Sequence, residues 1–239
     1  MNLPSKEPEG PELIAPVRHT VILIAILLGI AGYGVWLQAR APSNGQLVEE
    51  RGTAVPLYLS LAAAEWGLLR FVVAGGLRRT GTRFRDLLGE RWKGWQDVAR
   101  DVGLGLGAWA LWGAIEALVL PRLGPDTARG IATMLPRDLP EIAAWVVLSL
   151  TAGFCEEAIF RGYLLTQFRA ITGSTAAAIL IQGVIFGISH GYQGLRNVIT
   201  ISVLGVLYGA FATWRRSLKP GMILHAWTDL FSGIFASRV

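Results

Sequence analysis

The chain has 239 residues, of which 52% are hydrophobic and only 16% are charged, and its mean hydropathy is +0.45. Soluble domains carry about 25% charged residues, so this composition favours lipid over water. The formal net charge of +5 does not indicate a nucleic-acid partner, because the basic residues cluster between apolar runs, as in loops at a membrane surface. The single cysteine, Cys155, excludes an intrachain disulfide framework.

The apolar runs predict the architecture. A membrane-spanning helix requires about 20 mostly apolar residues. After a polar, proline-rich arm at 1–17, seven candidate runs follow, at 18–39, 54–77, 97–120, 139–169, 174–191, 195–214 and 219–236. The first lacks a small-residue cleavage site, so we expect a retained helix instead of a signal peptide. The sequence therefore predicts one all-α polytopic membrane bundle of about seven transmembrane helices.

Two basic loops predict the orientation of the bundle. The loop after the second run and the loop before the last run lie on the same side in a seven-helix count, and they hold Arg78, Arg79, Arg83, Arg85, Arg91, Lys93, Arg215, Arg216 and Lys219. Positively charged loops stay in the cytoplasm. We therefore expect an integral protein of a bacterial-type plasma membrane with its N-terminus in the cytoplasm.

A further helix is expected at the membrane surface, between the second and third runs. The segment TGTRFRDLLGERWKGW places Phe84, Leu87, Leu88 and Trp92 at roughly helical spacing among charged residues. This pattern predicts an amphipathic helix lying on the inner surface. Together with the transmembrane helices it would occupy residues 18–138, before a core at 139–236.

Three ionisable residues interrupt the fourth run. Intramembrane acids are rare, and by default they face the bundle interior and mark function. Glu157 and Arg161 are four residues apart on one helical face, so we expect them to form an ion pair. Glu156 is rotated by about 100° from Glu157 and lies five residues from Arg161. One glutamate is therefore expected to be neutralised locally, and the other to be free.

Two of the three histidines also lie in apolar runs. His190 follows Phe186 by four residues, and Asp229 follows His225 by four, so a carboxyl group can orient that imidazole from one turn away. Enzymes commonly use an acidic side chain together with a histidine to activate water. Each pair alone is weak evidence, because polar pairs also join helices structurally. Their convergence on three neighbouring helices favours one active site.

These three motifs, in this order, resemble those of the CPBP family of intramembrane proteases. The family includes CAAX prenyl proteases of the Rce type and the bacteriocin-processing or Abi proteins, and the resemblance covers residues 139–236. It implies that Glu156 and His190 activate a water, that His225 and Asp229 stabilise the oxyanion or orient the site, and that Glu157, Arg161 and Phe186 support it. The implied substrate is a membrane-associated peptide or protein, with lipid as the other partner and no cofactor. One departure is Asp229, where the family often has asparagine.

Several alternatives remain open at this point. Glu156, His190 and His225 with a water also match a catalytic zinc site, although no His-x-x-x-His pair is present. Cys155 faces away from Glu156 and is more typical of a buried structural thiol than of a nucleophile. Acids and histidines also suit a proton-coupled transporter. A catalytically silent scaffold or immunity protein on the same fold is a further possibility.

Overall fold

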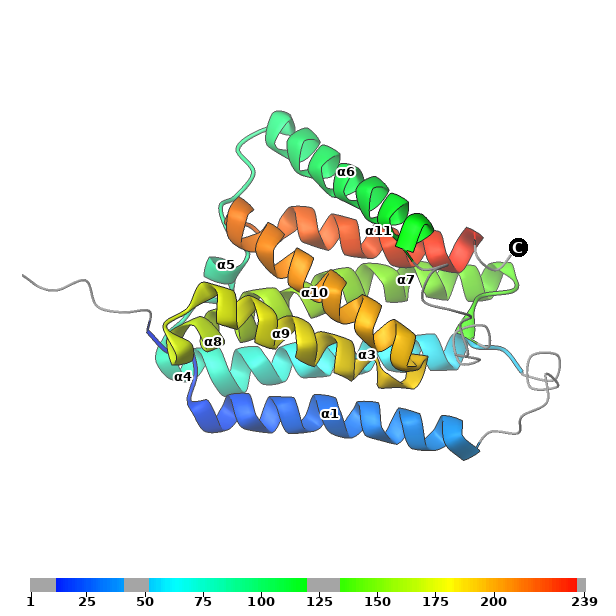
Figure 1. The fold of residues 1–239 in the computed structure, drawn as a ribbon, viewed down its shortest axis with the longest axis horizontal. Coiled ribbons are helices and arrows are strands. Elements are labelled where there is room, and N and C mark those ends of the chain that lie inside the picture. The colour runs from blue at the N-terminus through cyan, green and yellow to red at the C-terminus, as the bar shows by residue number, and fades with distance from the viewer. Residues whose placement is uncertain (1–11, 41–51, 120–133, 236–239) are drawn as a thin grey trace, which may run out of the picture.

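The computed structural model describes residues 12–40, 52–119 and 134–235. These residues form helices joined by short connections, as Figure 1 shows. In chain order the elements are α1 (Val17–Arg40), α3 (Val55–Phe71), η1 (Val72–Leu77), α4 (Arg78–Thr80), α5 (Phe84–Leu87), α6 (Trp95–Val119), α7 (Leu139–Glu156), η4 (Glu157–Leu164), α8 (Leu165–Thr172), α9 (Thr175–Ser189), η5 (Gly191–Gln193), α10 (Leu195–Arg215) and α11 (Lys219–Phe235).

The predicted helical membrane bundle is confirmed. All seven apolar runs are helical within the described residues, and their bounds differ from the expected ones by a few residues. Four helices of the described chain are both long and apolar enough to cross a membrane: Val17–Arg40, Val55–Thr80, Leu139–Thr172 and Leu195–Arg215. The helix α9 is apolar but has only 15 residues, about 22 Å of rise. It is therefore shorter than the full span expected for 174–191.

The predicted amphipathic surface helix is largely wrong. Only the four residues of α5 are helical there, because Gly89 adopts the left-handed region with φ 82° and ends the run. The backbone of the following residues turns to the loop before α11: Gly89 forms an isolated bridge with Ser217, and Leu218 N donates to Leu88 O at 3.3 Å. This pairing brings the two basic loops to the same end of the bundle.

Side chains fix where the central helices begin. Asp138 caps α7 by accepting a hydrogen bond from Glu141 N at 2.9 Å, and Ser174 caps α9 by accepting from Ala177 N at 3.2 Å. Glu141 also accepts from Ala54 N at 2.7 Å. The starts of α3 and α7 are thus joined at one end of the bundle.

The continuous helical segment α7–η4–α8 lies at the centre of the fold. It packs against α3, α9 and α11, while α10 pairs with α9 and α6 lies against α11 at one edge (Figure 1). All eight residues of the π-helical segment η4 are buried. Large apolar side chains such as Leu150, Leu180 and Ile30 are instead more than half exposed. The bundle is therefore polar at points of its interior and apolar on its outside, as lipid requires.

The start of the chain packs more closely than a free arm would. Most of 1–17 lies outside the described residues, but Ala15 is fully buried and its carbonyl accepts a hydrogen bond from Gln167 Nε2 at 2.7 Å. His19 is also buried, with Nδ1 2.8 Å from the Tyr163 hydroxyl and Nε2 3.1 Å from the Phe71 carbonyl oxygen. These contacts join α1 to the central helix.

Candidate active site

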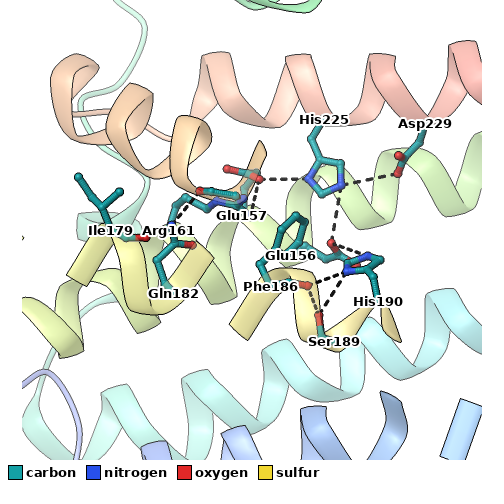
Figure 2. A network of polar contacts seen from close by, with 11 residues as sticks. Glu156, Glu157, Arg161, Ile179, Gln182, Phe186, Ser189, His190, His225 and Asp229 are labelled. Carbon is teal, nitrogen blue, oxygen red and sulfur yellow. Dashed lines mark hydrogen bonds and ion pairs between the residues drawn. The ribbon is translucent and has the colours of Figure 1, made fainter. Parts of the chain in front are cut away.

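The candidate catalytic residues come from three elements and meet in the interior of the bundle. Glu156 and Glu157 lie at the junction of α7 and η4, His190 directly follows α9, and His225 and Asp229 lie on α11. Figure 2 shows their side chains directed toward one another. The site residues predicted from the sequence are therefore brought together in one place.

Glu157 is at the centre of a buried polar cluster. Its Oε1 lies 3.0 Å from Arg161 Nη1, in the ion pair expected from the spacing of four, and both side chains are fully buried. The Arg161 guanidinium also lies 4.1 Å from the centre of the Phe186 ring and 5.0 Å from that of Tyr208. Aromatic faces attract a desolvated cation. Arg161 is therefore held on three sides.

His225 is oriented by Glu157 as well as by Asp229. Its Nδ1 forms a hydrogen bond of 3.1 Å with Glu157 Oε1. Its Nε2 lies 3.7 Å from Asp229 Oδ2 and 3.6 Å from Glu156 Oε2. The expected partner one turn away is thus close, but the shorter contact is to the glutamate on the neighbouring helix. Because a carboxylate only accepts, Nδ1 carries the hydrogen in that bond.

His190 presents its other nitrogen to Glu156. Its Nδ1 lies 2.8 Å from the Phe186 carbonyl oxygen, and its Nε2 lies 4.0 Å from Glu156 Oε2. A carbonyl oxygen is an acceptor, so Nδ1 is the donor, and in the neutral ring Nε2 keeps its lone pair. Phe186 therefore supports the site through its backbone as well as its ring, whose centre lies 4.8 Å from that of His190.

Glu156 is the carboxyl without a short protein contact. Its side chain is 19% exposed, and its Oε2 is a buried atom that lacks a hydrogen-bond partner in the described structure. The Nε2 atoms of His190 and His225 lie 4.0 and 3.6 Å from it. Separations above about 3.5 Å suit a bridging water instead of a direct bond. The arrangement can hold one water between a carboxylate and a basic imidazole nitrogen.

Two glycines allow the helices of the site to approach closely. A Cβ on Gly153 would lie 2.8 Å from backbone atoms of α11, at Ala226 N and Met222 O. A Cβ on Gly221 would lie 3.1 Å from Glu157 Oε2. Small residues let helices in membranes pack backbone to backbone. Spacing arguments had not identified these two positions, although small residues in apolar helices are the signal for them.

Glu65 on α3 is a further site residue to which sequence reasoning had assigned no role. Its carboxyl is within electrostatic range of Glu156, His225 and Asp229, and its Oε2 is buried without a hydrogen-bond partner in the described structure. The neighbouring Trp66 ring lies 5.6 Å from that of Phe154 on α7. Its position as an acid in an apolar run was the only signal for it in the sequence.

Zinc remains an alternative for the same donors. Glu156, His190 and His225 supply the carboxylate and imidazole ligands that zinc accepts. Within the described ranges, no three or more His, Cys, Asp and Glu side chains are arranged as a metal-binding group. Cys155 is a free thiol. Its burial does not favour a role as a nucleophile, because reactive cysteines are partly exposed.

Comparison with known proteins agrees with the motifs. Residues 138–231 match the model of the Rce1-like family, described as type II CAAX prenyl endopeptidase Rce1-like. The resemblance predicted from the three motifs is thereby confirmed for this segment. Comparison with curated proteins and with solved structures gives no significant match.

Proposed function

We propose, from the premise that residues 138–231 have the Rce1-like pattern of type II CAAX prenyl endopeptidases, that this protein is an intramembrane endopeptidase. Its substrate is a membrane-associated peptide or protein. Glu156 and His190 activate the attacking water. The observation that carries the proposal is the convergence of two imidazole Nε2 atoms on Glu156 Oε2, each ring being fixed through its Nδ1.

The proposed reaction assigns each group a step. Water between Glu156 Oε2 and His190 Nε2 loses a proton to Glu156 as its oxygen attacks the peptide carbonyl. That proton then passes to the leaving amine, so the carboxylate is regenerated. His225 is held by Glu157 and stabilises charge near the carbonyl oxygen. Burial among apolar helices makes each of these electrostatic contacts stronger than it would be in water.

The test is a set of matched glutamate substitutions in purified protein. Glu156→Gln keeps the shape of the side chain and removes the base, so cleavage of a peptide library in detergent should fall by about 10²–10⁴-fold. Glu116→Gln makes the same change on α6, which packs against α11 at the edge of the bundle, and should leave cleavage unchanged. Full activity of folded Glu156→Gln would contradict the mechanism.

Two further arms separate the alternatives. A chelator should leave activity intact. Loss of activity on chelation, restored by added zinc, would instead indicate a catalytic zinc site. The library should contain prenylated CAAX peptides, the same peptides without the prenyl group, and leader-type peptides. A transporter or a silent scaffold on this fold would cleave none of them, and the biological effect of a scaffold would survive Glu156→Gln.

We also propose that the chain lies in a bacterial-type plasma membrane with its N-terminus in the cytoplasm. The contacts of Gly89 with Ser217 and of Leu88 with Leu218 bring both basic loops to one end of the bundle. Positive loops are retained in the cytoplasm. Single cysteines introduced at Arg85 and Arg216, in a chain whose Cys155 is replaced by serine, should react with a membrane-impermeant thiol reagent only after cells are opened.

A further inference from the structure

The proposed hydrolysis requires a hydrogen-bond donor for the oxygen that becomes negative. Attack of water on a peptide carbonyl creates an oxyanion, and removing one preorganised donor typically slows such reactions by about 10²–10³-fold. The resemblance assigns this task to the pair on α11. However, an ionised Asp229 offers only acceptors, and the Nε2 of His225 faces two carboxyl groups. The site needs another donor.

Tyr192 lies beside His190 and carries a hydroxyl group of the kind required. It lies in the 3₁₀ turn η5, two residues after His190, and the centres of the two rings are 6.2 Å apart with the planes tilted by 31°. The Tyr192 side chain is within electrostatic range of the Glu156 and Asp229 carboxyl groups. The phenol oxygen accepts a hydrogen bond of 3.0 Å from Gln193 Nε2. That contact uses the oxygen as an acceptor, so the hydroxyl hydrogen is available for a second partner.

The position of Tyr192 depends on α1, a helix outside the family match. A Cβ added to Gly34 would lie 3.1 Å from Tyr192 Cβ, and one added to Gly191 would lie 3.3 Å from Val35 Cγ2. The turn η5 therefore packs directly against the backbone of α1. Any larger residue at position 34 would push the tyrosine away from α1.

We propose that the Tyr192 hydroxyl donates a hydrogen bond to the carbonyl oxygen of the scissile peptide as that oxygen becomes negative, and that Gly34 is the positioning residue that allows it. This inference rests on the proposed function. The tyrosine keeps its proton throughout, because the proton of the attacking water passes to Glu156 and then to the leaving amine. Tyr192 is therefore a catalytic residue without being an acid or a base.

The principal test removes only the hydroxyl group. Tyr192→Phe should lower kcat by about 10²-fold and leave KM within about threefold, because the lost contact forms only in the transition state. A tetrahedral peptidyl phosphinate inhibitor should lose affinity by the same factor as kcat/KM. Tyr33→Phe, at an exposed position of α1, makes the same change elsewhere and should behave as the wild type. A raised KM at normal kcat would overturn the inference.

Further variants separate this inference from the proposed function. If Glu156→Gln is inactive and Tyr192→Phe keeps the wild-type kcat, the inference alone is lost. If Glu156→Gln keeps full activity, both are lost. Gly34→Leu should lower kcat in the wild type and have less than a twofold effect in the Tyr192→Phe background. An equal effect in both backgrounds would show that Gly34 does not act through Tyr192.

Discussion

His225 Nδ1 lies 3.1 Å from Oε1 of Glu157, the same oxygen that Arg161 Nη1 contacts at 3.0 Å. One carboxylate oxygen therefore connects an imidazole on α11 with a guanidinium one turn further along the central helix. Glu157 neutralises the charge of Arg161 and also holds the His225 ring in place. It thereby leaves Glu156 to face both Nε2 atoms.

Breaking the buried ion pair is expected to destabilise the protein severely. Arg161→Met leaves Glu157 without its cation in the fully buried interior, and removal of one partner from such a pair typically costs about 3–5 kcal/mol. Arg18→Met at an exposed position of α1 is the matched control. Thermal unfolding in detergent should show a large loss for the first variant and almost none for the second. Equal midpoints would contradict the pairing.

Glu65→Gln is expected to stabilise the fold. The Glu65 carboxyl has a buried oxygen without a hydrogen-bond partner in the described structure and lies near the acids of the site. Burial beside Glu156 disfavours a charge on Glu65, so folding must neutralise this carboxyl group, and a permanently neutral amide avoids that cost. The unfolding midpoint should rise by a few degrees. Glu157→Gln should lower it, and a fall for both variants would show that Glu65 has a stabilising partner.

The tautomer of His190 can be measured directly. Because Nδ1 donates to the Phe186 carbonyl oxygen, the neutral ring should carry its hydrogen on Nδ1 and leave Nε2 unprotonated. Nitrogen NMR of labelled protein should assign these states. His19, whose Nε2 faces the Phe71 carbonyl oxygen and whose Nδ1 contacts a tyrosine hydroxyl, should show the opposite tautomer in the same spectrum. A protonated Nε2 in neutral His190 would remove its role as the hydrogen-bond acceptor for the attacking water.

Asp229→Asn is expected to preserve activity. The family often has asparagine at this position, and an amide offers a donor where the ionised carboxylate offers none. We expect kcat to remain within about threefold of the wild type or to rise. In the Tyr192→Phe background the same change should restore part of the lost rate. Inactivation by Asp229→Asn in folded protein would instead show that the carboxylate itself is required.

The close approach of α7 and α11 provides a fifth test. Gly153→Val should lower both stability and activity, because a side chain there meets the backbone of α11 at 2.8 Å and would move His225 away from the glutamates. Gly67→Val on α3, where a Cβ meets nothing within 4 Å, is the matched control. Thermal unfolding and peptide cleavage measure the two effects. Wild-type activity of Gly153→Val would contradict the packing.

Helical periodicity was sufficient to predict the pairing of Glu157 with Arg161, because both residues lie on one element and four residues set their geometry. The apolar runs were sufficient to assign Glu156, His190 and His225 to three separate segments of one bundle. Periodicity could not show that Glu157 would also hold His225, because that contact depends on how two helices pack.

Glu65 and Tyr192 were not predicted from the sequence for the same physical reason. Glu65 and Tyr192 reach the site from elements whose position depends on tertiary contacts, and neither belongs to a spaced motif. The surface helix was wrong for a local reason. Gly89 adopts a positive φ and pairs with Ser217 in the loop before α11. This backbone pairing replaces the helix that the spacing of apolar residues had predicted.

The length of α9 determines how water reaches a reaction that consumes it. A helix of about 22 Å that begins at one surface ends short of the other side of a hydrocarbon layer about 30 Å thick. An α9 that begins at the surface therefore places His190 and η5 at membrane depth, where irregular backbone is tolerated only inside protein or beside water. One additional helical turn in α9 would displace His190 by about 5.4 Å along the axis. The depth of the site and its hydration thus depend on the same fifteen residues.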